Sequence, residues 1–218
     1  MKVINTIWHW RWKAHLSTLN EAKKVKEEAN SGQGLVDFIV RSNEIEGYNL
    51  DPGDVKEAVE AYQAGESLSY IRTWGPNHKY IVSHLAGISA AKSGATSPSD
   101  VIKIHTAMGS DVLDPPARPG VLRSGIEAQS AGGTQYVPSK DVGNALSWWS
   151  KQSWDSPFEA HTVYELIHPF ADGNGRSGRI ILAAMMGFDY DAVNGMIGDG
   201  YFGTLDSVGE KYQGEFWL

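Results

Sequence analysis

Helix start signals followed by apolar residues at helical spacing recur along the chain and constrain its fold more than any other feature. Asp51 and Ser97 each stand directly before a proline, the usual pairing of an N-cap residue with proline in the first helical turn. Apolar residues then recur three and four positions apart, and Gly65 is placed to end the first of these helices. Ser139 is predicted to open a third helix. Helices therefore dominate the predicted secondary structure.

Two stretches depart from the helical pattern. Between residues 118 and 138, prolines and glycines separate short runs, which favours a β-hairpin over a helix. The tail, residues 189–218, holds six glycines and is predicted to form loops with one or two short helices. At 218 residues the chain is long enough to bury a hydrophobic core, and we expect a single domain.

The composition excludes several classes of protein and site. A formal net charge of -7 argues against a general nucleic-acid binder, because such a protein needs a basic surface to displace counterions from phosphates. The chain has no cysteine, so any metal would be bound by oxygen or imidazole ligands. No stretch approaches the ~20 apolar residues of a membrane span, and the first 13 residues do not resemble a signal peptide. We therefore expect a cytoplasmic protein with neither nucleic-acid nor membrane partners.

The run from His168 to Arg179 combines a base, a carboxylate, a glycine-rich turn and two arginines within twelve residues. Pro169 disfavours the α conformation at His168, so a helix is predicted to end there with the imidazole at the mouth of a loop. A neutral imidazole can accept the proton of a hydroxyl as that hydroxyl attacks phosphorus. The start of the run therefore suits a general base.

The glycine-rich turn after Asp172 is predicted to bind phosphate. Gly173 and Gly175 can adopt positive φ angles, which would point successive N–H groups into one concavity at the start of the next helix. Arg176 and Arg179 would share a face of that helix and reach further phosphates. The carboxylate of Asp172 is a suitable oxygen ligand for Mg²⁺.

Two other interpretations of these residues fit less well. Gly173, Gly175 and Gly178 match the spacing of a dinucleotide-binding loop, but a predicted helix precedes them where that fold needs a strand. His161 and His168 could share a helix face and bind zinc, but no third ligand accompanies them. We therefore interpret His161, and likewise His105, as packed core histidines.

The same twelve-residue run resembles the signature of Fic (Fido) proteins, His-x-Phe-x-(Asp/Glu)-Gly-Asn-Gly-Arg-x-x-Arg, and meets each of its fixed positions. The resemblance extends to a core over about residues 51–188. It implies a compact all-α bundle that transfers AMP from ATP to a Ser, Thr or Tyr hydroxyl of a target protein, with loss of pyrophosphate. Residues 1–50 would be an N-terminal helical segment, and residues 189–218 would complete the nucleotide pocket.

The resemblance also implies roles for individual residues. His168 would be the base for the target hydroxyl, and Asp172 would be the ligand of a Mg²⁺ cofactor, with ATP as co-substrate. Tyr201 is similar to a residue that lines the base pocket and would contact the nucleotide. The other motif residues would hold phosphates: Asn174 with the backbone of Gly173 and Gly175 at the α-phosphate, Arg176 at the β-phosphate and Arg179 at the γ-phosphate.

Residues 119–123 and 136–138 resemble the Fic flap, whose backbone holds the target segment as an added strand. A surface hairpin without that role is the alternative. If the resemblance holds, these residues would lie at the target: Gly120, Val121, Leu122 and Arg123.

Residues 42–47 resemble the Fic inhibitory pattern, (Ser/Thr)-x-x-x-Glu-(Gly/Asn), with Ser42, Glu46 and Gly47 at the fixed positions. Apolar periodicity predicts a helix over about residues 35–47 with Glu46 on its inward face. A carboxylate there needs a cationic partner, because an unpaired buried charge is costly. By the resemblance that partner is Arg179, and the pairing would keep the enzyme inactive.

The resemblance leaves several alternatives open. Relatives of the fold transfer UMP, phosphocholine or a phosphoryl group, and members with the inhibitory glutamate can remove AMP from a modified target. A binding module without chemistry is less consistent with the complete motif. Self-modification, a homodimer, delivery into a host cell, and inhibition by Glu46 from a neighbouring subunit are all compatible with the sequence.

Overall fold

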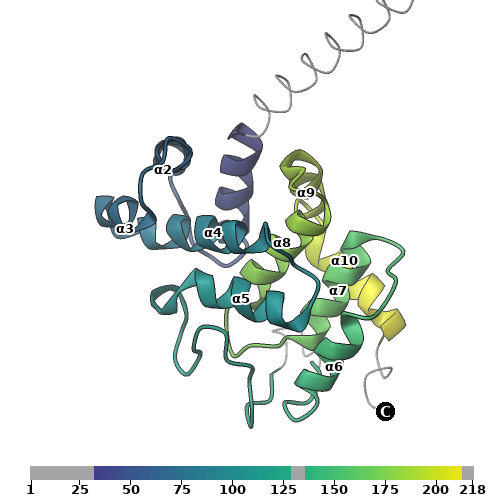
Figure 1. Ribbon diagram of the computed structural model, residues 1–218. Helices are drawn as coiled ribbons and strands as arrows, with labels where there is room; N and C mark the ends of the chain where they lie inside the picture. Colours follow the sequence, from purple (N-terminus) through teal and green to yellow (C-terminus); the bar gives the residue numbers. More distant parts are fainter. Residues whose placement is uncertain (1–31, 129–135, 213–218) are drawn as a thin grey trace, which may run out of the picture.

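The computed structural model of the chain describes residues 32–128 and 136–212, and these form a helical bundle (Figure 1). Residues 32–44 are helical, and the helix over this range is named the 32–44 helix here. The α-helices that follow are α2 (Pro52–Gln63), α3 (Leu68–Ile71), α4 (His78–Ala91), α5 (Pro98–Met108), α6 (Val142–Trp149), α7 (Pro157–Ile167), α8 (Asn174–Met185), α9 (Tyr190–Met196) and α10 (Tyr201–Gly209). Short 3-10 turns are η1 (Arg72–Trp74), η2 (Ser110–Val112) and η3 (Glu210–Tyr212). The predicted all-α class is confirmed.

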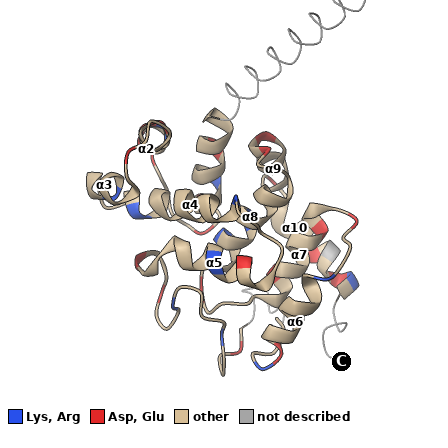
Figure 2. Cartoon of the chain, in the orientation of Figure 1, with Lys and Arg blue, Asp and Glu red and all other residues tan. Residues whose placement is uncertain are grey.

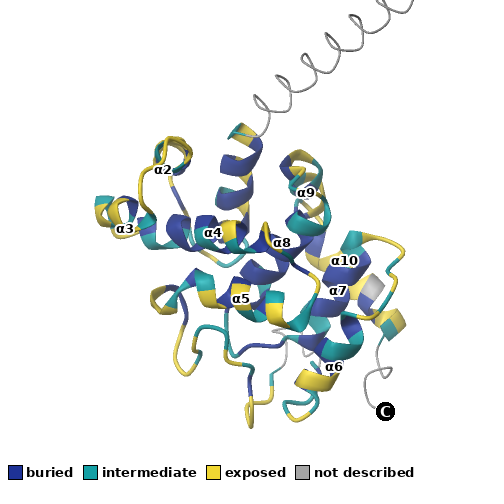
Figure 3. Cartoon of the chain, viewed as in Figure 1, coloured by how far each residue is buried: buried dark blue, intermediate teal, exposed yellow. Residues whose placement is uncertain are grey.

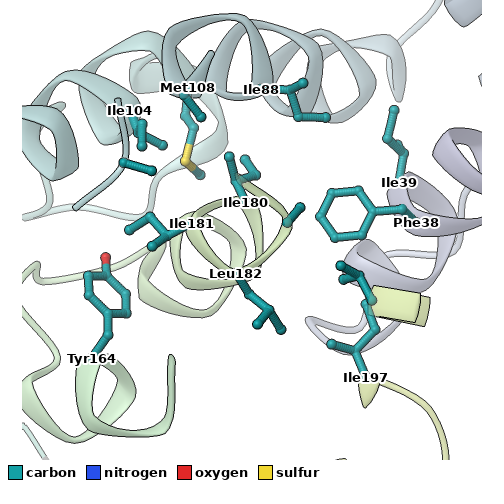
Figure 4. Packing of buried hydrophobic residues seen from close by; sticks show 14 of the residues in the cluster. Phe38, Ile39, Ile88, Ile104, Met108, Tyr164, Ile180, Ile181, Leu182 and Ile197 are labelled. Atoms are coloured by element: carbon teal, nitrogen blue, oxygen red, sulfur yellow. The ribbon is translucent and has the colours of Figure 1, made fainter. Parts of the chain in front are cut away.

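Helix α8 lies at the centre of the bundle and packs against α4, α5, α7 and α9 (Figure 1). Almost its whole length is buried (Figure 3). A Cβ atom at Gly87 of α4 would lie 2.8 Å from Cδ1 of Ile180, so glycine allows the two helices to approach closely. The core around α8 draws on distant parts of the chain: Phe38, Ile39, Ile88, Ile104, Met108, Tyr164, Ile181, Leu182 and Ile197 (Figure 4).

Most of the predicted helix starts are observed. Asp51 caps α2 by accepting from the N–H groups of Gly53 and Asp54, and Ser97 forms a capping box with Asp100. The third start is wrong, because α6 begins at Val142 after Asp141. The Ser139 hydroxyl donates instead to the exposed carboxylate of Glu127, which competes for the group that would cap a helix.

Helix α4 was not predicted, although it is one of the longest helices described. Nine of its residues are buried, and they lie on several sides of the helix: His78, Ile81, Val82, Ser83, His84, Leu85, Gly87, Ile88 and Ala91. A helix enclosed in this way has no continuous polar face, so its sequence lacks the amphipathic period that indicates a surface helix.

The predicted β-hairpin is not formed as a pair of strands in the described residues, and residues 129–135, which would hold its turn, lie outside them. On the described flanks, Leu122 forms an isolated antiparallel bridge with Phe170. The Tyr136 N–H donates to the Ala128 carbonyl at 3.3 Å, which joins the two flanks. The predicted tail is observed as two short helices and a 3-10 turn, with residues 213–218 outside the described part.

Residues from all three predicted segments share the hydrophobic core, and the predicted boundaries at residues 50 and 188 stay predictions. Residues 1–31 of the first segment lie outside the described residues. Charged residues occur on most of the described helices (Figure 2). Of the helices described, none is both long and apolar enough to cross a membrane.

Candidate active site

His168 lies where α7 ends, as Pro169 predicts. It is the C-cap residue of α7 and adopts the left-handed conformation, with φ 49° and ψ 62°. Only two non-glycine residues in the described chain have a positive φ, and such a conformation is costly for a side chain with a Cβ atom. The chain turns sharply at His168 and leads into the loop before α8.

The imidazole of His168 has a defined orientation and proton position. Nδ1 lies 3.3 Å from the Glu165 carbonyl, which can only accept a hydrogen bond, so the ring proton belongs on Nδ1 and the lone pair on Nε2. The ring stacks on Tyr136 with a centroid separation of 4.0 Å and an interplanar angle of 4°. Burial lowers the pKa of His168 to about 4, which keeps the imidazole neutral near pH 7.

The N-terminus of α8 has no side-chain cap among the described residues. Gly173 is its N-cap residue with φ 78°, whereas side chains of Asp51, Ser97 and Ser156 cap α2, α5 and α7. The first N–H groups of a helix have no intrahelical partner, and the helix dipole favours negative charge there. Gly175 is helical, so only Gly173 uses the positive φ that was predicted for both glycines.

The Asn174 side chain closes the loop before α8. Its Oδ1 accepts from the Phe170 N–H and its Nδ2 donates to the Phe170 carbonyl, both at 2.8 Å. The residue is 2% exposed. Asn174 therefore shapes the glycine-rich turn, and any direct contact of its side chain with a phosphate stays a prediction.

Arg176 and Asp172 form a pair beside this turn. Arg176 Nη1 donates to the Val112 carbonyl at 2.7 Å, and Nη2 donates to Asp172 Oδ2 at 3.3 Å. Asp172 Oδ2 also accepts from the Asp114 N–H at 2.9 Å. Within the described chain no donor bonds to Oδ1 of this partly exposed carboxylate, which leaves one oxygen for a cation.

The acidic residues and histidines of the described ranges form no cluster of three or more that could hold a metal ion. A site built on Asp172 alone fits Mg²⁺, because Mg²⁺ is commonly bound by one or two carboxylates together with substrate phosphates and water.

Arg179 bonds to residues 42–46, whereas Arg176 bonds to Val112 and Asp172. Its Nη2 donates to Glu46 Oε1 at 2.6 Å and to the Ser42 carbonyl at 2.8 Å, and its Nε donates to Ser42 Oγ at 2.9 Å. Burial acts to lower the pKa of Arg179, but the attraction of Glu46 and other nearby groups raises it above its ordinary value. The structure thus brings together Arg179 and the residues predicted to inhibit it.

Glu46 lies in a turn and not in a helix. The 32–44 helix ends before it, residues 45–47 form the turn, and Gly47 has φ 84°. A Cβ atom on Gly175 would collide with Glu46 Oε1 and would lie 2.9 Å from Arg179 Nη1. The carboxylate therefore rests against the first turn of α8, which is the predicted phosphate site.

His105 and His161 are packed and hydrogen-bonded, as predicted. His105 stacks on Phe170 at a centroid distance of 3.7 Å, accepts from the Gly120 N–H and bonds to the Asp172 carbonyl. His161 is buried and bonds to the Tyr201 hydroxyl at 2.7 Å. Tyr201 is 4% exposed, so its predicted contact with a nucleotide stays a prediction.

The flap residues differ in how far their side chains are exposed to solvent. Val121 is 54% exposed, Gly120 and Leu122 are partly exposed, and Arg123 is 2% exposed. The Arg123 guanidinium donates to the carbonyl groups of Ile126, Val137, Ile167 and His168. These bonds hold the Arg123 side chain beneath the flap, and the predicted place of this residue at the target stays a prediction.

Replacing Arg123 with methionine is expected to lower the free energy of unfolding by about 3 kcal/mol, because several buried carbonyl groups would lose their donor. For a protein of this size that corresponds to a fall in melting temperature of roughly 6–12 °C, measured by calorimetry. Arg118→Met, at an exposed position of the same segment, is the matched control. Equal melting temperatures for the two variants would contradict this role of Arg123.

The buried histidines predict a loss of stability in mild acid. Burial lowers the pKa of His84 and His161 to about 3, and that of His105 and His168 to about 4. Below pH 6.5 the unfolded chain binds protons at these positions that the folded protein does not. Glu165 acts in the opposite sense, because burial raises its pKa to about 8. Four histidines lower the stability in acid and Glu165 alone raises it, so the net effect of these groups is a loss of stability.

The free energy of unfolding is therefore expected to fall as the pH decreases from 6.5 toward 4, by about 1.4 kcal/mol per pH unit for each fully buried histidine. Urea unfolding at pH 7.5, 6.5 and 5.5 measures this change. A free energy of unfolding that is constant or higher at pH 5.5 would contradict it.

Three residues near the site were not predicted. Tyr136 was noted only as part of the flap, although its ring stacks on His168. Glu165 stands three positions before His168, and His84 bonds to Ser42 at 2.9 Å from α4. No local pattern indicates these contacts, and their only sequence signal is a titratable or aromatic side chain among apolar neighbours.

Comparisons with known proteins agree with this geometry. The sequence matches the Fic/DOC family over residues 95–186, which include the whole run from His168 to Arg179. It is 65% identical over 26 residues to a probable protein adenylyltransferase of Aquifex aeolicus, a match that covers 12% of this chain and 8% of that protein.

Solved structures share the fold at low sequence identity. A Fic domain containing signaling protein from Bacteroides thetaiotaomicron is 20% identical, with a TM-score of 0.53 over 76% of this chain and 65% of that one. A Fic family protein from Desulfovibrio desulfuricans is 20% identical, with a TM-score of 0.62 over 87% of this chain and 61% of that one. The chain spans less than two thirds of each of these relatives. Residues 95–186 match the Fic/DOC family, and the fold of the chain is similar to that of solved Fic proteins.

Proposed function

We propose that the protein is an adenylyltransferase that moves AMP from ATP to a hydroxyl group of a target protein, and that Glu46 keeps the resting enzyme inactive. The match to the Fic/DOC family and the short match to a probable protein adenylyltransferase support this class of reaction. The arrangement of His168, Asp172 and the α8 N-terminus supports the assignment of roles.

His168 accepts the proton of the target hydroxyl on Nε2. Its Nδ1–H donates to the Glu165 carbonyl, and its pKa of about 4 leaves Nε2 unprotonated at neutral pH. The hydroxyl oxygen forms a bond to the α-phosphorus of ATP, the bond to the bridging oxygen breaks, and pyrophosphate leaves.

The N-terminus of α8 and its arginines bind the phosphates of ATP. The uncapped N–H groups after Gly173 suit the α-phosphate region, and Arg176 and Arg179 suit the β- and γ-phosphates. Asp172 would hold Mg²⁺, which offsets phosphate charge when bound. The guanidinium groups of Arg176 and Arg179 would lower the energy of the pyrophosphate leaving group by offsetting its charge.

The single observation that carries the inhibition hypothesis is the 2.6 Å bond between Arg179 Nη2 and Glu46 Oε1. A carboxylate that occupies Arg179 and rests against Gly175 competes with the γ-phosphate for the same positive site. ATP then cannot take the position that aligns its α-phosphorus with the attacking hydroxyl. Removing the carboxylate frees the site.

The segment around Leu122 offers its backbone to a target. Leu122 pairs with Phe170 by a single bridge, and an extended target segment could add along the same edge. Val121, the exposed side chain of this segment, would lie beside that target. Self-modification and a homodimer remain part of this proposal, as does a cytoplasmic location where ATP is abundant.

Intact-mass spectrometry of the Glu46→Gly protein tests the reaction. Incubation with ATP and Mg²⁺ is expected to add the mass of AMP to the protein, and His168→Ala in the same background is expected to add nothing. A mass increase of one phosphoryl group, or one seen only with UTP, would assign a different transfer reaction. Loss of AMP from a previously labelled target would indicate the reverse activity.

A further inference from the structure

Arg179 is held by a chain of hydrogen bonds that begins on α4, outside the motif. Its Nε donates to Ser42 Oγ at 2.9 Å, and this oxygen lies 2.9 Å from Nε2 of His84. The other ring nitrogen of His84 lies 3.1 Å from the Tyr80 carbonyl, one turn earlier on α4. Ser42 and His84 are 0% exposed and Arg179 is 1% exposed, so bulk water does not compete for these bonds.

Donor and acceptor chemistry determines the direction of each bond. The Arg179 Nε–H can only donate, so Ser42 Oγ accepts from it and directs its own hydroxyl proton to Nε2 of His84. The Tyr80 carbonyl can only accept, so His84 carries its proton on Nδ1. The neutral Nδ1–H tautomer therefore completes the whole chain of bonds.

The surroundings of His84 favour this neutral form. Burial lowers the pKa of His84 to about 3, and the nearby arginines act in the same direction. The amide nitrogen of Asn43 also lies 3.3 Å from Nδ1, but it has a closer acceptor in the Ile39 carbonyl at 2.7 Å. A neutral ring offers Ser42 a lone pair, whereas a protonated ring would direct a second donor at a hydroxyl that already faces a guanidinium.

We propose that His84 is a positioning residue for Arg179. By accepting the hydroxyl proton of Ser42, it turns the oxygen lone pairs of Ser42 toward Nε and sets the plane of the guanidinium. This inference rests on the proposed binding of ATP by Arg179. The two bonds from Arg179 to Ser42 do not involve Glu46, so they persist when the carboxylate leaves. Arg179 then meets the γ-phosphate already oriented.

A double-mutant cycle, measured by steady-state kinetics in the Glu46→Gly background, tests the proposal. His84→Leu and Ser42→Ala are each expected to raise the KM for ATP by about 5- to 20-fold, the equivalent of one oriented hydrogen bond, while kcat stays within about twofold. The double variant is expected to match the more severe single variant, because both changes remove the same bond. An unchanged KM in His84→Leu, or additive effects, would overturn the proposal.

Two further variants separate positioning from general damage to the fold. Ser83→Ala removes a buried α4 hydroxyl for which residues 32–128 and 136–212 offer no hydrogen-bond partner, and it is expected to leave KM and kcat unchanged. His84→Gln keeps an acceptor in the side chain and is expected to recover part of the lost affinity. A KM for His84→Gln equal to that for His84→Leu would count against a role for the acceptor.

Nitrogen-15 NMR of labelled histidine gives a readout that does not depend on AMP transfer. In the wild type at pH 7, His84 is expected as the neutral Nδ1–H tautomer, and Ser42→Ala is expected to shift its Nε2 resonance. A proton on Nε2 would overturn the inference. If the NMR result holds and calorimetry with ATP reproduces the cycle, but no AMP is transferred, the proposed function fails and the role of His84 stands.

Discussion

The Glu46→Gly variant is expected to label itself from ATP and Mg²⁺ about 10- to 100-fold faster than the wild-type protein. In the wild type, ATP must displace a carboxylate that bonds to Arg179 at 2.6 Å and rests against Gly175. A charge-assisted hydrogen bond of this kind contributes about 1.5–3 kcal/mol, and each 1.4 kcal/mol corresponds to a tenfold change in apparent affinity. Glycine also suits the turn over residues 45–47, so the change leaves the 32–44 helix intact.

Initial rates of AMP incorporation at subsaturating ATP measure this effect. Glu44→Gly is the matched control, because it also replaces a glutamate with glycine. Glu44 is exposed at the end of the 32–44 helix. The Glu46→Gly protein is also expected to melt at a lower temperature, since Arg179 is left buried with less compensating charge. Equal rates in wild type and Glu46→Gly would rule out inhibition by Glu46.

His168→Ala in the Glu46→Gly background is expected to lower the rate of AMP transfer by about 10²- to 10⁴-fold, the usual contribution of a general base. The change removes the lone pair on Nε2 and leaves the arginines and the α8 N-terminus in place. The effect is therefore expected in kcat, with little change in the binding of ATP. Single-turnover kinetics and calorimetry measure the two quantities separately.

The control for this variant is His78→Ala, which removes a buried histidine at the start of α4, outside the site. Its rate is expected to match that of Glu46→Gly alone. If His168→Ala retained more than a tenth of the rate, another group would have to accept the proton. If His168→Ala lost ATP binding, the lower rate would not show that His168 accepts the proton.

Local features of the sequence predicted much of the fold. The caps at Asp51 and Ser97 and the helix end at His168 depend on residues within a few positions, so they can be read without knowledge of the packing. The predicted helix start at Ser139 is wrong because a more distant residue intervenes. The Ser139 hydroxyl donates to Glu127, twelve positions away. Helix α4 escaped detection because it is enclosed by the protein and lacks a polar face.

The residue types of the site could also be predicted from the sequence, because the histidine, carboxylate and arginines of residues 168–179 lie in one short run. The sequence did not predict where the side chains of the site point. Asn174 and Arg123 were predicted to meet ligands, and the structure places both side chains on backbone carbonyl groups in the interior. A long polar side chain bonds to whichever acceptor the packing brings near, so its direction depends on neighbours that are remote in the sequence.

Arg179 illustrates this division most clearly. The amino-acid sequence alone specifies a guanidinium on α8 and a carboxylate at Glu46 that needs a cation. Which arginine it meets depends on the packing of the 32–44 helix and α4 around α8, since Glu46 and Arg179 are 133 positions apart. The same packing brings His84 to Ser42 across 42 positions. Local periodicity carries no information about such contacts, because they form only when the shared hydrophobic core brings these helices together.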